Sequence, residues 1–521
     1  MLDHRVEPHD ANQLELKLAY VVEPGRRRVR YQVETFLFVP KTLGIDRHSY
    51  DADRFFADTA AFLRLRTPSI ALASLASANR ANVWFRDLER DLARPLGQGD
   101  GRRLVRRIKI LGCIYRQALG DDARPLVEQL AGAPAPDPLA EGRLQETCAR
   151  HLQQFARNLE RALARLRALD EECLARGYGD LVCDTWRAVD EYTAMIAEDA
   201  CTDLVEAIAR RTRRSPLEHP DLTDARDVLA RAAFDAQRYR RERGYRSQLF
   251  AGESNEALPH WRRTIKRIVY SALYLDVRHE EGDRLVRDIV GMAAAAIAMA
   301  FAIAVTIFAQ ITWDLLSGSF VAIMIVMYMI KDRLKEWGKR YLGGRVARMT
   351  PDRVVVVRDA GGEAPIGVCR ESFVILPPRS LEPAIEAARH SRRLSEIERS
   401  GRPEAVIRYT KDVTLDSAAL KEELAGLEGL QDVIRFNLGH LRDRMDTPRE
   451  DHRLVDPQTG RVEVIPCARV YHLNLVLRLT VGSGATRRQT IERVRVVLDQ
   501  NGIKRVEFLD ANGRVSTTTP A

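Results

Sequence analysis

The sequence predicts a membrane protein with a two-helix transmembrane hairpin. A mostly α-helical N-terminal cytosolic domain that opens with a β-hairpin precedes this hairpin, and an α+β C-terminal cytosolic domain follows it. Three observations predict this fold class. Residues 289–311 contain no ionisable side chain, a second apolar run occupies 315–330, and basic residues flank the pair. Apolar runs of this kind are typical of helices that cross a bilayer.

Length and composition describe a folded protein with a membrane insert. The 521 residues are enough for two or three packed units, and 45% are hydrophobic while 30% are charged. The formal net charge is +9, with only ten lysines among the 82 basic residues. Four of these lysines, 266, 331, 335 and 339, flank the hairpin, where cations meet anionic lipid head groups. The expected partner is therefore a lipid bilayer with anionic head groups.

Cysteine usage and the N-terminus indicate a reducing compartment. The seven cysteines include no CxxC pair, and their odd number does not favour a disulfide framework or a zinc cage. The first residues show no basic stretch followed by an apolar one, so no secretion signal is expected. The strong preference for arginine over lysine is typical of a bacterial coding bias.

The predicted N-terminal cytosolic domain covers residues 1–258. Period-two alternation predicts a β-hairpin at 13–39, and helical spacing follows at about 51–66, 76–94, 101–119, 140–176, 179–213 and 222–243. A proline-rich stretch at 131–142 predicts a loop. The run from Arg102 to Ile110 is basic, but its apolar positions fall on one helical face and no aromatic residues are interleaved, so no nucleic acid is expected as a partner. Residues 259–288 are predicted to form a juxtamembrane helix.

The transmembrane hairpin is predicted at 289–330, as helices 289–311 and 315–330. As a helix, the first run is about 34 Å long and the second about 24 Å. The turn between the runs has one acid and no base, whereas Arg278, Arg284 and Arg287 precede the first run and six basic residues follow the second. Because positive residues stay in the cytoplasm, the sequence predicts a multi-pass protein of the bacterial inner membrane with both termini cytoplasmic.

Two sets of candidate site residues belong to this hairpin. Small residues at fourth positions, Gly291 with Ala295 and Ala296 with Ala300 and Ala304, predict close helix packing, either against the second run or against a neighbouring copy. A homo-oligomer is therefore expected. The predicted membrane-interface residues are aromatic or basic: Trp313, Tyr328, Lys331, Arg333, Lys335, Trp337, Lys339 and Arg340.

Beyond the hairpin, residues 331–345 are predicted to extend the second helix and 346–521 to form the α+β domain. Strand signals occur at 352–359, 366–376, 404–415, 461–481 and 504–510, and helical spacing occurs at about 380–399, 416–443 and 486–501. This mixture predicts a sheet covered by helices.

No motif for nucleotide, acyl-transfer or metalloprotease chemistry is present, so no catalytic residue, metal or cofactor is predicted. Three polar groups in the sequence could form a site: Asp276, His279, Glu280, Glu281 and Asp283; His440, Asp443 and Asp446; and His472 with Asn474. Each is interpreted as solvated side chains rather than as a site.

Three functions remain open. A membrane-anchored binding, scaffold or signalling protein that self-associates needs no further site. An oligomeric channel or pore would need a ring of copies, and its architecture resembles that of CorA-type cation channels; however, their Gly-Met-Asn signature is absent, with Gly291, Met292 and Ala293 as the nearest match. A membrane-anchored enzyme is the third hypothesis.

Overall fold

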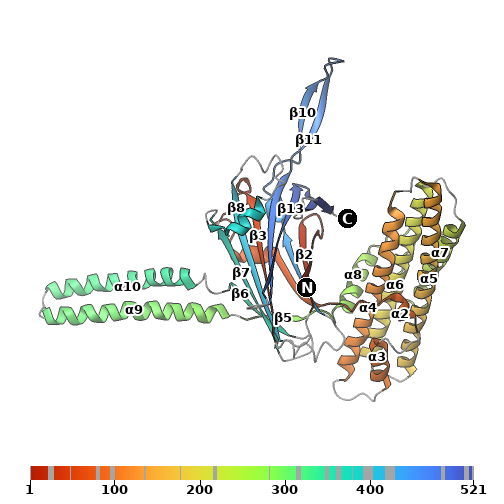
Figure 1. The fold of residues 1–521 in the computed structure, drawn as a ribbon. Coiled ribbons are helices and arrows are strands. Elements are labelled where there is room, and N and C mark those ends of the chain that lie inside the picture. The colour runs from red at the N-terminus through yellow and green to blue at the C-terminus, as the bar shows by residue number, and fades with distance from the viewer. Residues whose placement is uncertain are drawn as a thin grey trace. The chain divides into compact units, whose positions relative to one another are not determined.

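The computed structural model describes residues 2–21, 28–46, 48–77, 83–93, 100–133, 137–175, 178–214, 220–280, 282–312, 318–346, 351–358, 365–377, 380–390, 403–416, 429–482, 487–509 and 515–518. The chain forms two compact units (Figure 1). Unit 1 comprises Met1–Leu63, Leu275–Glu423 and Leu430–Ala521, and unit 2 comprises Arg64–Tyr274 with Leu424–Gly429.

Unit 1 is built around a nine-stranded antiparallel sheet. Its order is β15 (Val515–Thr518), β14 (Gly502–Leu509), β13 (Arg488–Asp499), β12 (Tyr471–Val481), β3 (Arg28–Pro40), β8 (Glu404–Asp416), β7 (Pro365–Leu376), β6 (Arg353–Arg358) and β5 (Asp276–Glu280). The central strand is β3, which pairs with β12 on one side and with β8 on the other. An N-terminal strand therefore holds the middle of a sheet made mostly from the C-terminal half.

A second sheet has the order β1 (Leu2–Pro8), β2 (Gln13–Val21), β9 (Gly429–Asn437) and β4 (Thr59–Leu65). Side chains of the two sheets meet in a common core, where Tyr20 of β2 stacks on Tyr31 of β3 with ring centroids 5.3 Å apart. Short helical turns complete the unit: η1 (Lys41–Leu43), α1 (Ala52–Asp58), α11 (Pro383–Arg389) and α14 (Gly439–Arg442).

A separate two-stranded ribbon interrupts the path from β9 to β12. It consists of β10 (Arg449–Val455) and β11 (Val462–Ala468), joined by a turn in which Asp456 accepts from Thr459 and Gly460 takes a positive φ of 64°. Every residue of both strands is exposed. Figure 1 shows this β10–β11 ribbon as a long narrow pair.

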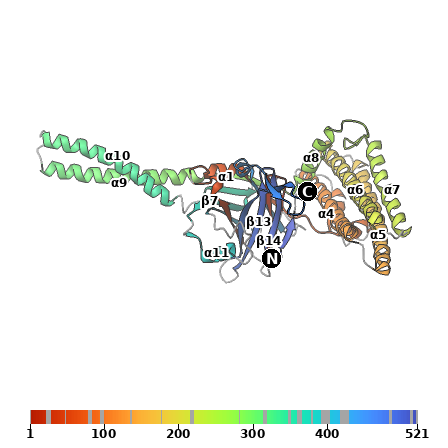
Figure 2. The same cartoon turned by 90° about the horizontal axis from the view of Figure 1, so that it is seen from above.

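Unit 2 is a bundle of long helices (Figures 1 and 2). It contains α2 (Leu72–Ala76), α3 (Val83–Ala93), α4 (Asp100–Ala131), α5 (Pro138–Ala175), α6 (Asp180–Arg214), α7 (Pro220–Glu242) and α8 (Ala257–Tyr270). Aromatic side chains such as Trp186 and Tyr115 are fully buried between the helices. The Arg211 guanidinium of α6 is also buried and donates to Glu141 at the start of α5, with a Nε–Oε1 distance of 2.9 Å, and to the Gly132 carbonyl.

Two antiparallel helices, α9 (Gly282–Thr312) and α10 (Gly318–Val346), form what we call the arm. The strand before the arm is β5 and the strand after it is β6, and these two strands pair with each other in the nine-stranded sheet. The arm is thus an insertion between two neighbouring strands, and both of its ends return to the same sheet edge.

The predicted two-span transmembrane hairpin is wrong. Among the described residues, one segment, Gly291–Ile311 of α9, is long and apolar enough to cross a membrane. In α10 the apolar run from Gly318 to Ile330 is followed directly by Lys331, Asp332 and Arg333. Thirteen helical residues extend about 20 Å, whereas the hydrocarbon core of a bilayer is about 30 Å thick. The remaining turns of α10 are charged.

The predicted division into an N-terminal helical domain opening with a β-hairpin and a separate C-terminal domain is also corrected. The strands predicted at 13–39 do not belong to the helical unit, because β3 pairs with β8 and β12 from beyond the arm. The two predicted strands do not pair with each other either: β2 lies in the smaller sheet and β3 in the larger one.

Four predicted helices contain strands instead. Residues 59–65 of the helix predicted at 51–66 form β4. Residues 488–499 form β13, which pairs with β12 and β14, and residues 429–437 form β9. The predicted juxtamembrane helix 259–288 ends with α8 at Tyr270 and gives way to β5. In β13 the residues Ile491, Val494 and Leu498 also match helical spacing, but Val494, Val496 and Val497 are β-branched and fully buried among neighbouring strands. Residues 391–399 and 417–428 of the predicted helices lie outside the described chain.

Candidate functional site

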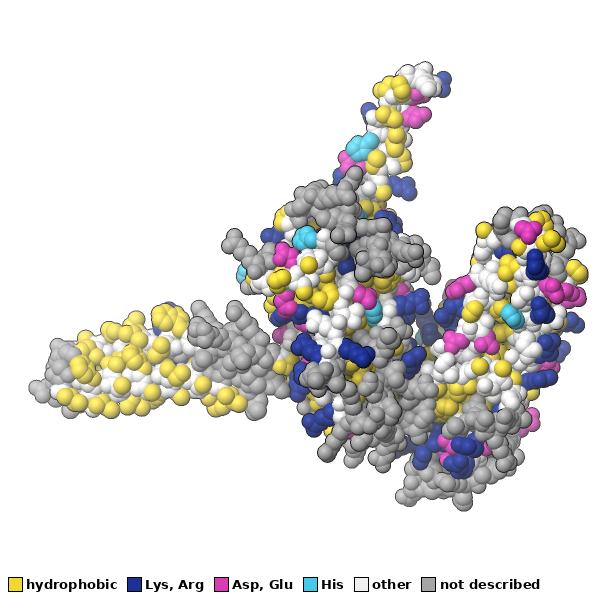
Figure 3. Space-filling view, in the orientation of Figure 1, with side chains coloured by type: hydrophobic (Ala, Val, Ile, Leu, Met, Phe, Trp, Pro, Cys, Tyr) yellow, Lys and Arg dark blue, Asp and Glu magenta, His cyan; other side chains and the backbone are white. Residues whose placement is uncertain are grey.

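The apolar surface of the arm is the first candidate site. Large apolar side chains of α9 are exposed around much of the helix: Ile289, Met292, Ile297, Met299, Phe301, Ile303, Ile307, Phe308 and Ile311, each at least 40% exposed. Only 17% of the Gly291–Ile311 segment is buried within the protein. In Figure 3, hydrophobic side chains cover much of the face of the arm that is turned to the viewer. Soluble proteins rarely leave such an extended apolar surface in water.

A line of small side chains joins the two helices of the arm. Ala294, Ala298 and Ala309 of α9 are buried, as is Met327 of α10. The two helices approach so closely that a methyl group added at Gly338 would lie 3.1 Å from the Ala294 side chain. Towards the other end, the Thr306 hydroxyl lies 3.9 Å from the Met324 sulfur.

These two contacts show which residues of α9 and α10 lie side by side along the arm. Because Gly338 lies opposite Ala294 and Met324 lies near Thr306, Lys331 of α10 is level with the middle of the apolar segment of α9. Both helices are apolar only in the half that contains 301–311 and 318–330. In the other half, the apolar part of α9 runs beside the charged turns of α10.

The structure separates the predicted packing residues into two groups. Gly291 and Ala295 are half-buried, although no atom lies within 4 Å of a side chain built at Gly291. Ala296, Ala300 and Ala304 are exposed, because α10 packs on the neighbouring line through Ala294 and Ala298. In the described residues, the 296–300–304 line is therefore not covered by α10.

The predicted interface residues lie where α10 changes from apolar to charged. Tyr328 and Trp337 are 64% and 63% exposed, and the Lys331 ammonium lies 4.2 Å from the centre of the Tyr328 ring. Arg333 is exposed and Lys335 half-buried. Trp313 falls outside the described residues, as do the side chains of Lys339 and Arg340, although both of the latter positions belong to α10.

The structure places the first two polar groups of the sequence on different elements. Residues 276–280 form strand β5 rather than a helix, Glu281 lies outside the described chain, and Asp283 begins α9. His440 stacks on Tyr50 at 5.5 Å, whereas Asp446 accepts from the Tyr471 hydroxyl at 3.0 Å. Across the described residues, no cluster of three or more His, Cys, Asp or Glu side chains is suited to a metal ion.

His472 and Asn474 are buried rather than solvated, at 8% and 0% exposure. The Asn474 amide oxygen accepts two hydrogen bonds from Arg493, at 3.0 and 2.7 Å. Alternation in the sequence places these side chains on one strand face correctly, but it does not reveal that Arg493 of the adjacent strand covers that face.

A cavity of about 530 Å³ lies at the base of the β10–β11 ribbon, lined in part by Glu404, Glu450, Cys467, Arg469 and His472. Its charged side chains are paired with one another. Arg389 donates to Glu404 at 2.6 and 3.1 Å, and Arg469 pairs with Glu450 and with Asp446. The volume suits a small molecule, but the ion pairs leave the lining close to neutral. Local sequence patterns could not predict this cavity, because its walls come from segments far apart in the chain.

The core of unit 1 contains an ionic cluster. The Lys411 ammonium of β8 donates to Asp432 of β9 at 2.6 Å, Tyr31 donates to the same carboxylate at 3.2 Å, and Tyr409 donates to Glu371 at 2.6 Å. Burial would lower the pKa of Lys411, but the nearby acidic groups, Asp432 foremost, raise it above its ordinary value. Burial raises the pKa of Tyr409 and of the Cys369 thiol. The contacts of Lys411 and Tyr31 with Asp432 join the two sheets.

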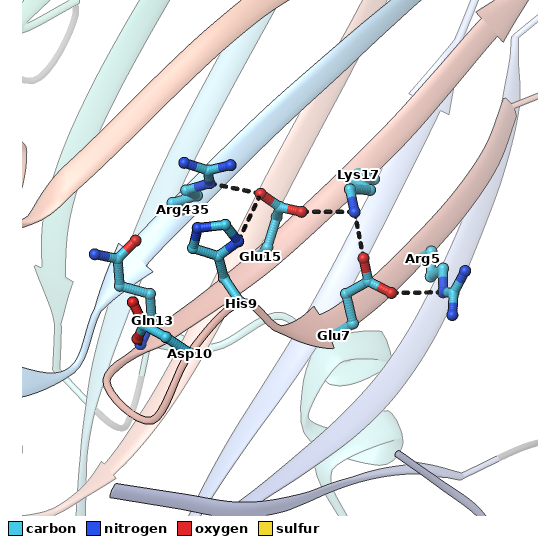
Figure 4. A network of polar contacts seen from close by, with 8 residues as sticks. All are labelled: Arg5, Glu7, His9, Asp10, Gln13, Glu15, Lys17 and Arg435. Atoms are coloured by element: carbon cyan, nitrogen blue, oxygen red, sulfur yellow. Dashed lines mark hydrogen bonds and ion pairs between the residues drawn. The ribbon is translucent and has the colours of Figure 1, made fainter. Parts of the chain in front are cut away.

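A second network lies on the smaller sheet (Figure 4). The buried Glu15 carboxylate accepts from Arg435 at 2.5 Å and lies 2.7 Å from Lys17, which also pairs with Glu7. Burial alone would raise the pKa of Glu15, but the hydrogen bonds from Lys17 and Arg435 outweigh it and lower the pKa. This network fastens β2 to β9.

Comparisons with protein-family models, with curated proteins and with solved structures find no match to this chain.

Proposed function

We propose that this is a protein of the bacterial inner membrane whose arm anchors it, and whose folded units serve as a self-associating binding or scaffold protein. The observation that carries the proposal is the exposed apolar surface of α9. Full transfer of one large apolar side chain from water is worth about 1.5–3 kcal/mol. Five of these side chains, Phe301, Ile303, Ile307, Phe308 and Ile311, lie in the half of the arm where both helices are apolar, and for them a lipid environment supplies on the order of 5 kcal/mol.

The arm supports insertion from one side of the bilayer. Because β5 and β6 pair with each other, the chain must leave and re-enter the membrane on the same side. The half of the arm in which both helices are apolar is about 20 Å long, shorter than the hydrocarbon core. Lys331 and Arg333 then meet the head groups, and the exposed ring of Tyr328, about one turn before Lys331, suits nearly the same depth.

The distribution of charge supports insertion from the cytoplasmic side. Basic residues on both flanks of the arm favour the cytoplasmic face, where anionic lipids attract them. In this arrangement both termini are cytoplasmic. The exposed Ala296, Ala300 and Ala304 leave room for the arm of a neighbouring copy to pack against α9.

Flotation of the purified full-length protein with liposomes tests the anchor. The wild type should float with vesicles containing anionic lipid, whereas Ile307→Asp/Phe308→Asp should stay in the dense fraction. These side chains are 52% and 63% exposed, so the change leaves the contact between α9 and α10 intact. Phe234→Asp, at an exposed apolar position on α7, is the matched control and should float. If the wild type does not float, or if the arm variant floats equally well, the arm is not a membrane anchor.

A further inference from the structure

The β10–β11 ribbon leaves apolar side chains and a strand edge uncovered. Leu454, Val455, Val462 and Val464 are each more than 50% exposed, and Ile465 is 41% exposed. Among the described strands, β10 pairs with β11 alone, so each strand has a free outer edge. An isolated two-stranded hairpin is marginally stable in water, and a free apolar edge is a template for further pairing.

The two edges are not equivalent. Strand β11 contains Pro466, which has no N–H, and proline in a sheet is confined to edges where that missing donor faces solvent. Strand β10 contains no proline over its seven residues. The outer edge of β10 is therefore the one able to form a continuous ladder of hydrogen bonds.

The charges of β10 are self-complementary. Side chains directly opposite each other in an antiparallel pair lie on the same face of the sheet. When two β10 strands pair across a two-fold axis, the axis must therefore pass between one residue and the same residue of the other copy, which is the central residue of the pair. When His452, the middle of the strand, is the central residue, all seven residues of both strands overlap. Asp451 of each copy then lies opposite Arg453 of the other copy. When Asp451 is the central residue, Arg449 of one copy lies opposite Arg453 of the other. When Arg453 is the central residue, the Arg453 side chains of the two copies lie opposite each other.

Opposite charges across a strand pair stabilise it by roughly 0.2–1 kcal/mol each, and like charges destabilise it. In the described chain, neither Asp451 nor Arg453 forms an ion pair, and both are exposed. The pairing centred on His452, which overlaps all seven residues, is thus also the pairing that the charges favour.

We propose that β10 pairs antiparallel with β10 of a second copy, centred on His452, to form a four-stranded sheet across a two-fold axis. The sheet covers the free edge, satisfies Asp451 and Arg453, and extends the apolar faces of both ribbons. This inference rests on the proposed self-association and names a surface for it outside the membrane.

Cysteine cross-linking of the full-length protein in detergent tests the register. The background is Cys467→Ser, because Cys467 is exposed. With His452→Cys, the two new thiols face each other and mild oxidation should give a covalent dimer. With Leu454→Cys, the thiols lie four residues out of register, about 13 Å apart, which exceeds the Cα separation of about 7 Å that a disulfide tolerates. This matched control should stay monomeric under denaturing, non-reducing conditions.

Charge exchange tests the pairing independently. In the His452→Cys background, Asp451→Arg or Arg453→Asp alone should reduce cross-linking at least threefold, and the double exchange Asp451→Arg/Arg453→Asp should restore it. Equal cross-linking of the 452 and 454 variants, or failure of the double exchange to rescue, would overturn the proposed register.

The native mass of the same samples separates this inference from the proposed function. A dimer without cross-linking at 452 overturns the ribbon pairing and leaves self-association intact. A monomer throughout overturns both, while membrane anchoring is decided separately by flotation.

Discussion

Lys411 of β8 donates a hydrogen bond to Asp432 of β9 at 2.6 Å, and this contact joins the nine-stranded sheet to the four-stranded sheet. The two side chains are 4% and 2% exposed. Removing one partner of a charge pair this deeply buried destabilises the fold far more than replacing both partners by apolar residues.

Lys411→Met should therefore destabilise unit 1 by about 3–5 kcal/mol, because the Asp432 carboxylate would stay buried without its cation. Chemical denaturation of the detergent-solubilised protein, followed by tryptophan fluorescence and circular dichroism, measures the change. Lys411→Met/Asp432→Leu should lose clearly less than the single variant. An equal or larger loss in the double variant would show that the pair contributes net stability.

In unit 2, Glu141→Ala should cost about 3–5 kcal/mol, since it leaves the buried Arg211 guanidinium without its carboxylate. The matched control is Glu206→Ala on α6. Glu206 pairs with Arg210 at 2.5 Å on the surface, where both side chains are more than half exposed, so its loss should cost less than about 1 kcal/mol. Thermal unfolding of both variants measures the difference. Similar losses would contradict a structural role specific to the buried pair.

Acid should weaken the smaller sheet through Glu15. The folded state lowers the pKa of this carboxyl below its ordinary value of about 4, so the ionised form stabilises the fold above that value. The stabilisation is lost as the pH falls through the lower folded-state pKa. Denaturation midpoints measured between pH 7 and pH 3 should fall more steeply for the wild type than for Glu15→Gln. If the midpoints of the wild type and of Glu15→Gln fell equally with pH, Glu15 would not be the source of this pH dependence.

Within the arm, Gly338→Leu should push α9 and α10 apart, because even a methyl group at this position would lie 3.1 Å from the Ala294 side chain. Gly291→Leu is the control in the same pair of helices, since no atom lies within 4 Å of a side chain built there. Spin labels at exposed positions 299 and 333 report the helix separation by pulsed electron resonance. The distance should widen with Gly338→Leu alone, and an unchanged distribution would argue against the close contact.

Local patterns in the sequence predicted much of unit 2, because its helices are long and amphipathic. Helical spacing at 140–176 and 179–213 corresponds to α5 and α6. The alternating patterns at 404–415 and 366–376 likewise correspond to β8 and β7. These signals come from neighbours a few residues apart, which is the range over which periodicity is informative.

Partners far apart in sequence could not be predicted. Arg30 hydrogen-bonds to Asp412, 382 residues away, and nothing local to either residue indicates the other. The buried Arg211–Glu141 pair and the cavity near Cys467 depend on similar long-range packing. The apolar residues of β13 match helical spacing, although they form a strand buried on both faces. Periodicity alone cannot distinguish a strand of this kind from a helix.

The central position of β3 has a consequence for biosynthesis. Its Glu34 is made 444 residues before Arg478, which binds it from β12. At about 5–20 residues per second, the ribosome needs roughly 20–90 s to deliver that partner. During this time the local contacts of unit 2 can form and α9 emerges, while β3 still lacks both neighbours. Synthesis of the arm thus precedes completion of the sheet, so the apolar surface of α9 is made while the central strand of the sheet is still unpaired.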